Sequence, residues 1–145
     1  MIEGVIVKDL KVIPDDKGEV RHMLRRDDPL FKNFGEIYFS FVNPGQVKAW
    51  KKHTLQTQCF AVPVGSLHLV IYDDRPASLT RGAVEEFLIG EDQYQLIMIP
   101  PGLWYGFTTT GHFKTMIANC TDIPHDPLEC VRKDSKDPAI PYQWK

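Results

Sequence analysis

Polar side chains able to move protons or stabilise charge are gathered in two short segments of the sequence. The first is framed by Gly45 and Gly65 and contains Lys51 and His53. The second, Pro100–Tyr105, places a tyrosine three residues after a glycine. Histidine side chains ordinarily titrate close to neutral pH, and an inward-pointing lysine could hold a phosphate or an enolate oxygen by its charge. These residue types permit proton transfer together with stabilisation of negative charge.

The same segments hold a poor set of metal ligands. A divalent cation in a protein is held by several good donors, usually imidazole, thiolate or carboxylate groups. Four of their polar side chains, His53, Lys51, Gln58 and Tyr105, offer one imidazole, one cation and two neutral groups. Cys59, Cys120 and Cys130 are widely spaced and form no CxxC pair, which favours free thiols in a reducing compartment. We therefore expect no bound metal.

Each candidate residue also has a purely structural interpretation. His53 could be a structural histidine in a barrel wall, and Tyr105 could be a core or rim aromatic. Lys51 and Lys52 are neighbours in a strand-like segment, so one should point inward and the other into solvent. A second histidine, His68, lies inside a strand-like run, which favours packing over chemistry.

The elements that must position these residues are strands. Apolar and polar residues alternate with a period of two in short runs that end at turn-forming residues. The runs expected to form strands are Gly4–Ile13, Glu36–Val42, Cys59–Val64, Leu67–Tyr72, Ala83–Ile89, Gln95–Ile99 and Lys114–Asn119. This spacing predicts an all-β sandwich or barrel of antiparallel strands. Short helices are expected at Asp28–Asn33 or Pro127–Val131, and the tail Lys133–Lys145 should pack across the barrel surface.

Length and charge narrow the function classes. The chain has 145 residues, which suits one domain over residues 1–145. Its net charge of -2 gives no nucleic-acid signature, and no apolar run is long enough to span a membrane. The N-terminal residues alternate and carry charge, unlike the apolar region of a signal peptide. We expect a cytoplasmic protein that acts on neither nucleic acid nor membrane.

The spacing of the two segments resembles that of the cupin motifs. The first cupin motif places two metal-binding histidines and a glutamate between glycines, and the second reads Pro-x-Gly-x-x-His. Here Gly45 is followed after five residues by Lys51, and Gln58 is followed after six residues by Gly65. Tyr105 stands at the histidine position of the second motif. The resemblance implies a double-stranded β-helix, the cupin or jelly-roll barrel, that lacks the cupin metal.

Within the cupins, the sequence resembles the nucleotide-sugar epimerases related to dTDP-4-dehydrorhamnose 3,5-epimerase over nearly its whole length. The most specific match is Ile99–Gly102 followed by Gly106-Phe107. Weaker matches are Gly4–Leu10, Asp16–Gly18, Asp73–Arg75, Asn119–Asp122 and Asp137–Ile140. The resemblance implies a metal-free isomerase of polysaccharide biosynthesis that needs no cofactor. Its substrate would be a dTDP-linked 4-keto-6-deoxyhexose, with a proton removed alpha to the 4-keto group at one or both of C3 and C5.

The resemblance also implies roles for individual residues. His53 stands where the family's base stands, and Arg25 aligns with an arginine that contacts the nucleotide diphosphate, for which a guanidinium is well shaped. Either Tyr105 or Tyr38 could supply the acid that returns a proton. His53 and Tyr105 are the expected catalytic residues. The residues expected to bind substrate are Arg25, Tyr38, Lys51, Gln58 and Glu129.

The sequence departs from the family at three functional positions. The family's proton-donating tyrosine matches Ala118, and its active-site lysine matches Gln58. The aspartate that orients the family's base has only Ser135-Lys136-Asp137 as a counterpart. These departures favour an alternative function, a non-catalytic module that binds a nucleotide sugar. A related 3,4-ketoisomerase would use paired histidines, and the partner position here is Lys51.

The resemblance further implies a homodimer, because such barrels commonly pair through their N-terminal strands. Two tryptophans lie beside the motif residues, Trp50 and Trp104. Large aromatic side chains are suited both to stacking on a ring and to burial in an interface. They could therefore bind the base or sugar of a ligand, or fill the dimer interface.

Overall fold

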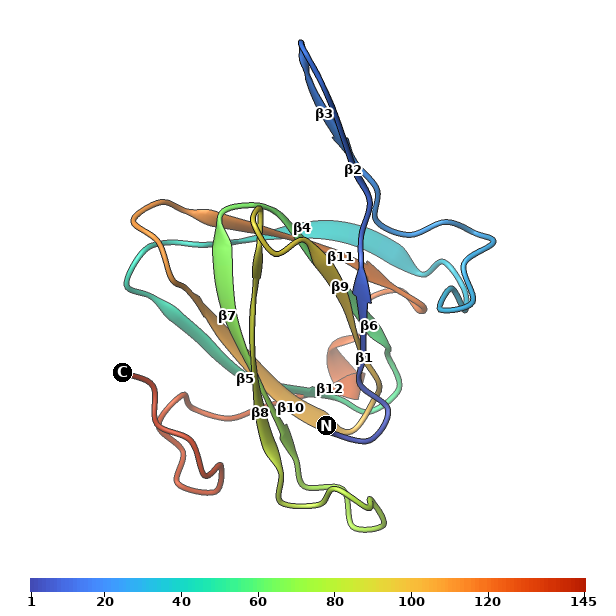
Figure 1. Ribbon diagram of the computed structural model, residues 1–145. Coiled ribbons are helices and arrows are strands. Elements are labelled where there is room, and N and C mark those ends of the chain that lie inside the picture. Colours follow the sequence, from blue (N-terminus) through green and yellow to red (C-terminus); the bar gives the residue numbers. More distant parts are fainter.

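Two antiparallel five-stranded sheets face each other, as Figure 1 shows. The computed structural model describes all residues, 1–145. The first sheet has the order β1 (Ile6–Asp9), β9 (Gln95–Ile99), β6 (Gln58–Val64), β11 (Thr115–Thr121) and β4 (Glu36–Val42). The second has the order β12 (Cys130–Arg132), β5 (Val47–His53), β10 (Leu103–Thr109), β7 (Ser66–Asp73) and β8 (Val84–Gly90). This is the predicted jelly-roll architecture.

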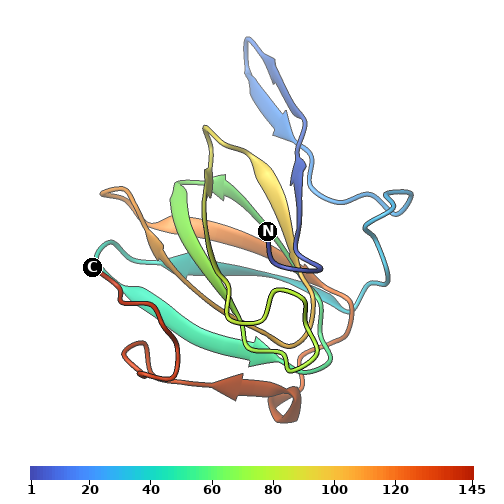
Figure 2. The ribbon, with the colours of Figure 1, turned by 60° about the horizontal axis from the view of Figure 1, so that its bottom comes forward.

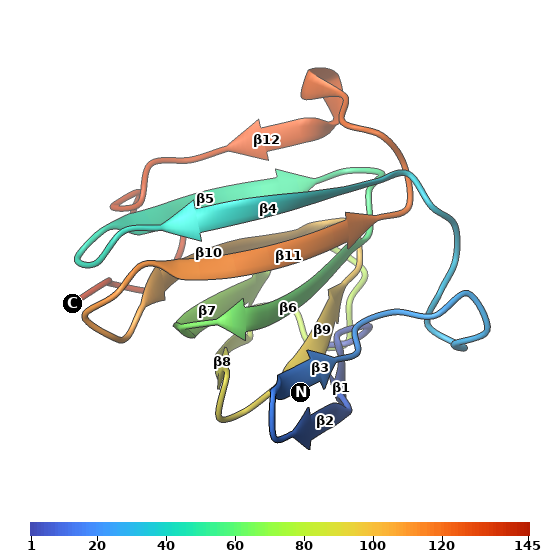
Figure 3. The same cartoon turned by 90° about the horizontal axis from the view of Figure 1, so that it is seen from above.

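The core fills the space between the two sheets. Because successive side chains of a strand point to opposite faces, each strand contributes alternate residues to this layer. Fifteen buried residues form one continuous cluster, to which both sheets contribute. Figure 3 shows the sheets from above, with β4 and β11 facing β5 and β10 across the space that holds the candidate site.

The N-terminal segment differs from the single strand predicted over Gly4–Ile13. β1 ends at Asp9, and the chain then leaves the sheet to form a hairpin of β2 (Val12–Asp15) and β3 (Gly18–Arg21). The Asp15 carboxylate accepts hydrogen bonds from the backbone amides of Lys17 and Gly18, which closes the turn. Figures 1 and 2 show this hairpin projecting away from the two sheets.

Three strands were not predicted from the sequence, β3, β10 and β12, and β5 was expected only as a strand-like segment around Lys51 and Lys52. β5 carries polar residues on both faces, because one face lines a cavity and the other meets the C-terminal tail, and this weakens its alternation. Of the predicted helices, Asp28–Asn33 is an irregular loop, and only Pro127–Glu129 forms a single 3-10 turn. The structure contains no helix with the length and apolar character needed to cross a membrane.

The C-terminal tail covers the outer face of the second sheet, as predicted. Ile140, Tyr142 and Trp144 pack against Trp50 and Trp104 on that face. The ring centroids of Trp50 and Trp144 lie 5.3 Å apart. Both tryptophans are thus occupied within the chain, and in Figure 2 the tail crosses the outside of the barrel before the C-terminus.

The motif glycine Gly65 has a clear structural reason. It forms the turn between β6 and β7 with φ of +90°, a conformation that residues with a side chain rarely adopt. A Cβ atom at this position would lie 2.4 Å from Thr115 Oγ1. Only glycine fits, so the spacing from Gln58 to Gly65 reflects the length of β6.

Candidate active site

His53 is held between two buried hydrogen-bonding partners at the end of β5. Its Nδ1 lies 2.5 Å from Oε1 of Glu129, and its Nε2 lies 2.9 Å from the hydroxyl oxygen of Tyr105. The imidazole and phenol rings are nearly parallel, with an interplanar angle of 16°. His53 and Tyr105 come from neighbouring strands, whereas Glu129 follows far later in the chain, in the 3-10 turn before β12.

The hydrogen bonds define the tautomer of His53. A carboxylate only accepts hydrogen bonds, so Nδ1 of His53 must carry the proton that Glu129 receives. When the ring is neutral, Nε2 is the unprotonated nitrogen, and the Tyr105 hydroxyl donates to it. A buried carboxylate on one nitrogen and an unprotonated second nitrogen, here covered by the Tyr105 hydroxyl, is an arrangement that suits a general base.

Glu129 is built to remain ionised although it is only 3% exposed. Burial raises the pKa of its carboxyl, but the hydrogen bond from His53 and those from the backbone amides of Leu55 and Gln56 outweigh burial, so the net pKa is lowered. Its Oε1 holds His53 and its Oε2 holds the two amides. Glu129 therefore positions the histidine.

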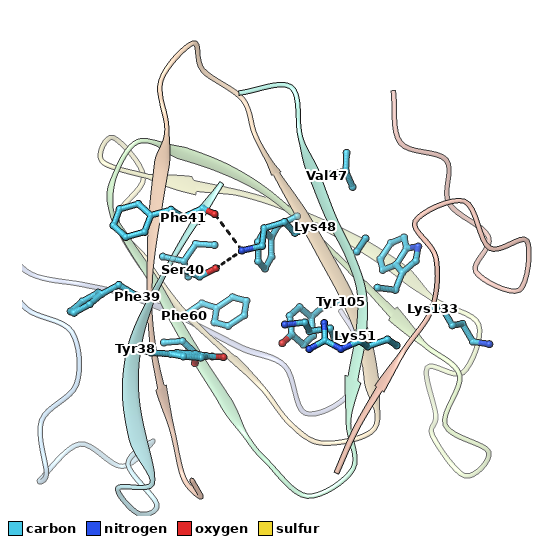
Figure 4. A pocket seen from close by; sticks show the side chains of 16 residues that line it. Tyr38, Phe39, Ser40, Phe41, Val47, Lys48, Lys51, Phe60, Tyr105 and Lys133 are labelled. Carbon is cyan, nitrogen blue, oxygen red and sulfur yellow. Dashed lines mark hydrogen bonds between the residues drawn. The ribbon is translucent and has the colours of Figure 1, made fainter. Parts of the chain in front are cut away.

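A cavity of about 540 Å³ opens beside this group, between β4–β11 and β5–β10. Figure 4 shows its side chains converging from both sheets. The lining residues are Tyr38, Phe39, Ser40, Phe41, Val47, Lys48, Ala49, Trp50, Lys51, Phe60, Tyr105, Phe107, Ile117, Asn119, Arg132 and Lys133. Tyr105 thus separates His53, which is 7% exposed, from the cavity.

The cavity is cationic. Its lining includes Lys48, Lys51, Arg132 and Lys133 but no aspartate or glutamate. Lys51 lies in register with Tyr105 on one side and with Arg132 on the other. Burial, and next the charge of Arg132, lower the pKa of Lys51. Cations gathered in a partly apolar cavity select an anionic ligand.

The opposite wall is neutral, and its polar side chains are joined by hydrogen bonds. The hydroxyl of Tyr38 on β4 accepts a 2.9 Å hydrogen bond from the side-chain amide of Asn119 on β11. The same Asn119 amide donates to Gln58 on β6, which in turn donates to Gln56. Burial is the main cause that raises the pKa of Tyr38, so this phenol is protonated at neutral pH.

The structure brings together some of the predicted substrate-binding residues and separates others. Tyr38 and Lys51 line the cavity, and Lys52 points to the outer face, where it pairs with Asp74. Gln58 is fully buried behind Asn119 and does not line the cavity. Arg25 lies on an exposed loop, paired with Asp27, outside the cavity.

Glu129, predicted to bind substrate, is buried and does not line the cavity, and its carboxylate oxygens accept hydrogen bonds from His53 and from two backbone amides. Glu129 contacts His53 where the sequence suggested Asp137 as the orienting carboxylate. Asp137 instead accepts a hydrogen bond from the backbone amide of Ala139 in a turn of the tail. Sequence reasoning missed Asn119 and Arg132. Only the pairing of the strands reveals them. Asn119 lies opposite Tyr38, and Arg132 lies opposite Lys51.

The donor set does not fit a metal ion. Of the four positions that correspond to cupin ligands, Gln58 is engaged with Gln56 and Asn119, and both nitrogens of His53 are engaged with Glu129 and Tyr105. No group of three or more His, Cys, Asp or Glu side chains in the chain is arranged to hold a metal. The site is organised for hydrogen bonding and proton transfer.

Comparison with known proteins agrees with this architecture. The chain is 51% identical in sequence to a dTDP sugar isomerase from Desulfovibrio desulfuricans G20, whose crystal structure superposes with a TM-score of 0.97 over 99% of this chain and 92% of that one. It is 34% identical to the spore coat polysaccharide biosynthesis protein SpsL of Bacillus subtilis (strain 168), over 99% of this chain and 97% of the relative.

A third relative comes from an archaeon. The chain is 36% identical to the "Probable low-salt glycan biosynthesis epimerase Agl13" of Haloferax volcanii, over 97% of this chain and 88% of the relative. The family model described as dTDP-4-dehydrorhamnose 3,5-epimerase matches residues 1–145, the whole chain. With its jelly-roll barrel and its inward-facing histidine, this protein belongs to the dTDP-4-dehydrorhamnose 3,5-epimerase family.

Proposed function

We propose that this protein epimerises a dTDP-linked 4-keto-6-deoxyhexose at C3, C5 or both. The observation that carries the proposal is the chain of hydrogen bonds from Glu129 through His53 to Tyr105, which ends at a cationic cavity. The chain belongs to a family named for this reaction, and a relative of 51% identity is described as a dTDP sugar isomerase. The lining cations suit the diphosphate of such a substrate.

His53 acts as the base. Its Nε2 takes the proton from the carbon alpha to the keto group, and the electrons of the C–H bond move into an enolate. The imidazolium that forms is stabilised by the buried Glu129 carboxylate 2.5 Å from Nδ1. An opposite charge that is already in place and shielded from water lowers the barrier without reorganisation.

Tyr105 and Lys51 act on the enolate oxygen. In the ligand-free protein the Tyr105 hydroxyl occupies the lone pair of His53 Nε2. A substrate C–H bond placed at that lone pair displaces this hydrogen bond, and the freed hydroxyl donates to the neighbouring keto oxygen. Burial, and next the charge of Tyr38, raise the pKa of Tyr105, so it donates a hydrogen bond without losing its proton. Lys51, its neighbour across the strands, adds positive charge.

We extend the proposal to a homodimer that acts on nucleotide sugars in the cytoplasm. The hairpin β2–β3 projects from the barrel and exposes Ile13 and Val20, as an arm that packs on a second subunit would. Arg25 lies outside the cavity of its own chain. Its predicted contact with the nucleotide diphosphate would therefore be made to the partner subunit's ligand.

A second candidate function is a module that binds nucleotide sugars without catalysis. It is favoured by Ala118, which stands at the position of the family's proton-donating tyrosine and does not line the cavity. It is also favoured by the Tyr105 hydroxyl, which covers the base. In such a module the cations would hold the diphosphate, and the His53 hydrogen bonds would serve only to close the cavity floor.

Product analysis together with calorimetry tests the two functions. The protein is incubated with dTDP-4-keto-6-deoxy-D-glucose, the sugar is followed by NMR, and binding of dTDP is titrated separately. Inversion at C3 or C5 together with saturable dTDP binding supports the epimerase. Binding of dTDP without any inverted sugar supports the binding module. Absence of both would contradict both functions for this class of ligand.

A further inference from the structure

Tyr38 and Tyr105 occupy opposite walls of the same cavity. Tyr38 comes from β4 at the edge of the first sheet, and Tyr105 comes from β10 at the centre of the second. Figure 4 shows the two phenols turned toward each other across the cavity. A ring-shaped ligand between the sheets would present one face to the group of His53 and Tyr105, and the other face to Tyr38.

The direction of the hydrogen bond to Tyr38 is fixed by the groups behind it. The side-chain oxygen of Asn119 accepts a hydrogen bond from the backbone amide of Cys59, so its nitrogen must face Tyr38 and Gln58. Gln58 cannot reverse this order, because its own nitrogen donates to Gln56, 2.6 Å away. Gln56 is held in turn by the backbone oxygen of Ile123.

This network leaves Tyr38 as a donor. Its hydroxyl oxygen accepts from Asn119, and its proton has no acceptor within the chain. The only other hydroxyl of this wall that lines the cavity belongs to Ser40, whose oxygen is engaged by the ammonium group of Lys48. Both hydroxyls therefore keep an unengaged proton, but a phenol is a much stronger acid than an aliphatic alcohol, so Tyr38 is the group of this wall that can give its proton to a carbanion.

We propose that Tyr38 is the general acid that protonates the substrate carbon on the face opposite His53, with Asn119 as the residue that positions it. The proposal rests on the epimerase function proposed above. His53 Nε2 removes the proton, and the C–H electrons form the enolate. The enolate carbon then forms a new C–H bond with the Tyr38 proton, the keto group is restored, and a phenolate remains. Solvent returns a proton to Tyr38 and removes one from His53.

The assignment explains how the chain can invert a centre although Ala118 stands at the family's tyrosine position. Ala118 does not line the cavity, whereas its neighbours Ile117 and Asn119 do, because successive residues of β11 point to opposite faces. Tyr38 lies on the adjacent strand, directly opposite Asn119 in register. The acid is thus supplied from β4.

Exchange and inversion can be measured separately in heavy water. The substrate dTDP-4-keto-6-deoxy-D-glucose is incubated with wild type, Tyr38→Phe and, as a matched loss of a phenol hydroxyl on the outer surface, Tyr142→Phe. NMR reports deuterium in recovered starting sugar and in inverted sugar. Because His53 can still remove and return a proton on its own face, Tyr38→Phe should keep deuterium uptake into the starting sugar. Inversion should fall about 100-fold or more, while Tyr142→Phe behaves as wild type.

Several outcomes would overturn the role of Tyr38. Inversion by Tyr38→Phe at the wild-type rate would do so, as would a parallel loss of exchange and inversion with dTDP binding intact. A wild-type protein that shows neither exchange nor inversion would instead contradict the epimerase function itself, and the two failures are therefore distinguishable.

The positioning role of Asn119 has its own variant. In Asn119→Asp both side-chain oxygens accept hydrogen bonds, so the Tyr38 proton is drawn toward residue 119 and away from the ligand. We expect the ratio of exchange to inversion to rise as in Tyr38→Phe. A merely structural role would lower the midpoint of thermal unfolding and leave that ratio unchanged, which would contradict the positioning role.

Discussion

The second sheet carries two histidine–glutamate pairs, one on each face. On the inner face His53 and Glu129 lie 2.5 Å apart, and their side chains are 8% and 3% exposed. On the outer face His68 and Glu86 lie 3.1 Å apart, and their side chains are 23% and 54% exposed. The same two residue types thus form a buried pair on one face of the sheet and a solvent-exposed pair on the other.

The difference supports the role of base that we propose for the inner histidine. Water screens the outer pair, and exposed polar pairs of this kind contribute little free energy. The His68 ring also packs beside Trp144 and Tyr142, so it contributes to holding the C-terminal tail on this face. The inner pair is shielded from water, its carboxylate is held by two amides, and its second nitrogen faces a phenol at the cavity.

Replacing each histidine by asparagine gives the largest expected contrast. His53→Asn removes the base and should lower kcat/KM about 1,000-fold or more, because a positioned acid–base group contributes roughly 100- to 10,000-fold. His68→Asn makes the same change on the outer face and should leave kcat/KM within about twofold. Steady-state rates of sugar inversion measure both, and equal losses in the two variants would erase the distinction between the pairs.

Replacing the two carboxylates sharpens the comparison. Glu129→Gln should lower kcat about 10- to 100-fold, the size of the loss when a group that orients a metal-binding histidine is removed. A glutamine cannot accept from the His53 ring and from both backbone amides at once, so the ring loses its orientation. Glu86→Gln serves as the control and should retain wild-type kcat. A fully active Glu129→Gln would show that His53 needs no oriented carboxylate.

Removing a cavity cation should affect binding more than chemistry. Arg132→Ala takes a guanidinium from the cavity, and we expect KM for the nucleotide sugar to rise about tenfold, equivalent to roughly 1.4 kcal/mol. The exposed Arg81, on the loop between β7 and β8, provides the control Arg81→Ala. Calorimetric titration with dTDP measures the same loss directly. An unchanged affinity would place the diphosphate elsewhere.

The smallest effect concerns stability and its dependence on pH. The lowered pKa of Glu129 means that its interactions stabilise the fold above the pKa of an unfolded glutamate, about 4.3. That contribution disappears as the pH falls through the lower, folded pKa. Glu129→Gln should therefore cost about 1–3 kcal/mol of unfolding free energy at pH 7 and progressively less below pH 4. Denaturant unfolding at both pH values checks this, and a difference that grew with acidity would reverse the sign.

The sequence predicted the barrel because glycine and proline punctuate most strands. It indicated β5 only as a strand-like segment around Lys51 and Lys52, without bounds, because Lys48, Lys51 and Lys52 obscure the alternation. His53, Tyr105, Lys51 and Tyr38 were predicted as site residues, and the structure places them at or directly behind one cavity.

The remaining site residues depend on contacts between distant segments. Glu129 reaches His53 across 76 residues of chain, and Asn119 reaches Tyr38 across 81. No local pattern encodes such pairs, since their proximity follows from strand order and register. Only the folded chain shows that Gln58 lies behind the cavity wall and that the loop carrying Arg25 lies outside the cavity.

Solvent deuterium exchange tests the central claim most directly. Wild-type protein and His53→Asn are incubated in heavy water with dTDP-4-keto-6-deoxy-D-glucose, and the C3 and C5 protons are followed by NMR. The account predicts deuterium at one or both carbons with wild type and none with His53→Asn, while both proteins bind dTDP. Deuterium uptake that persists in His53→Asn, or that is absent from a wild-type protein saturated with the sugar, would contradict it.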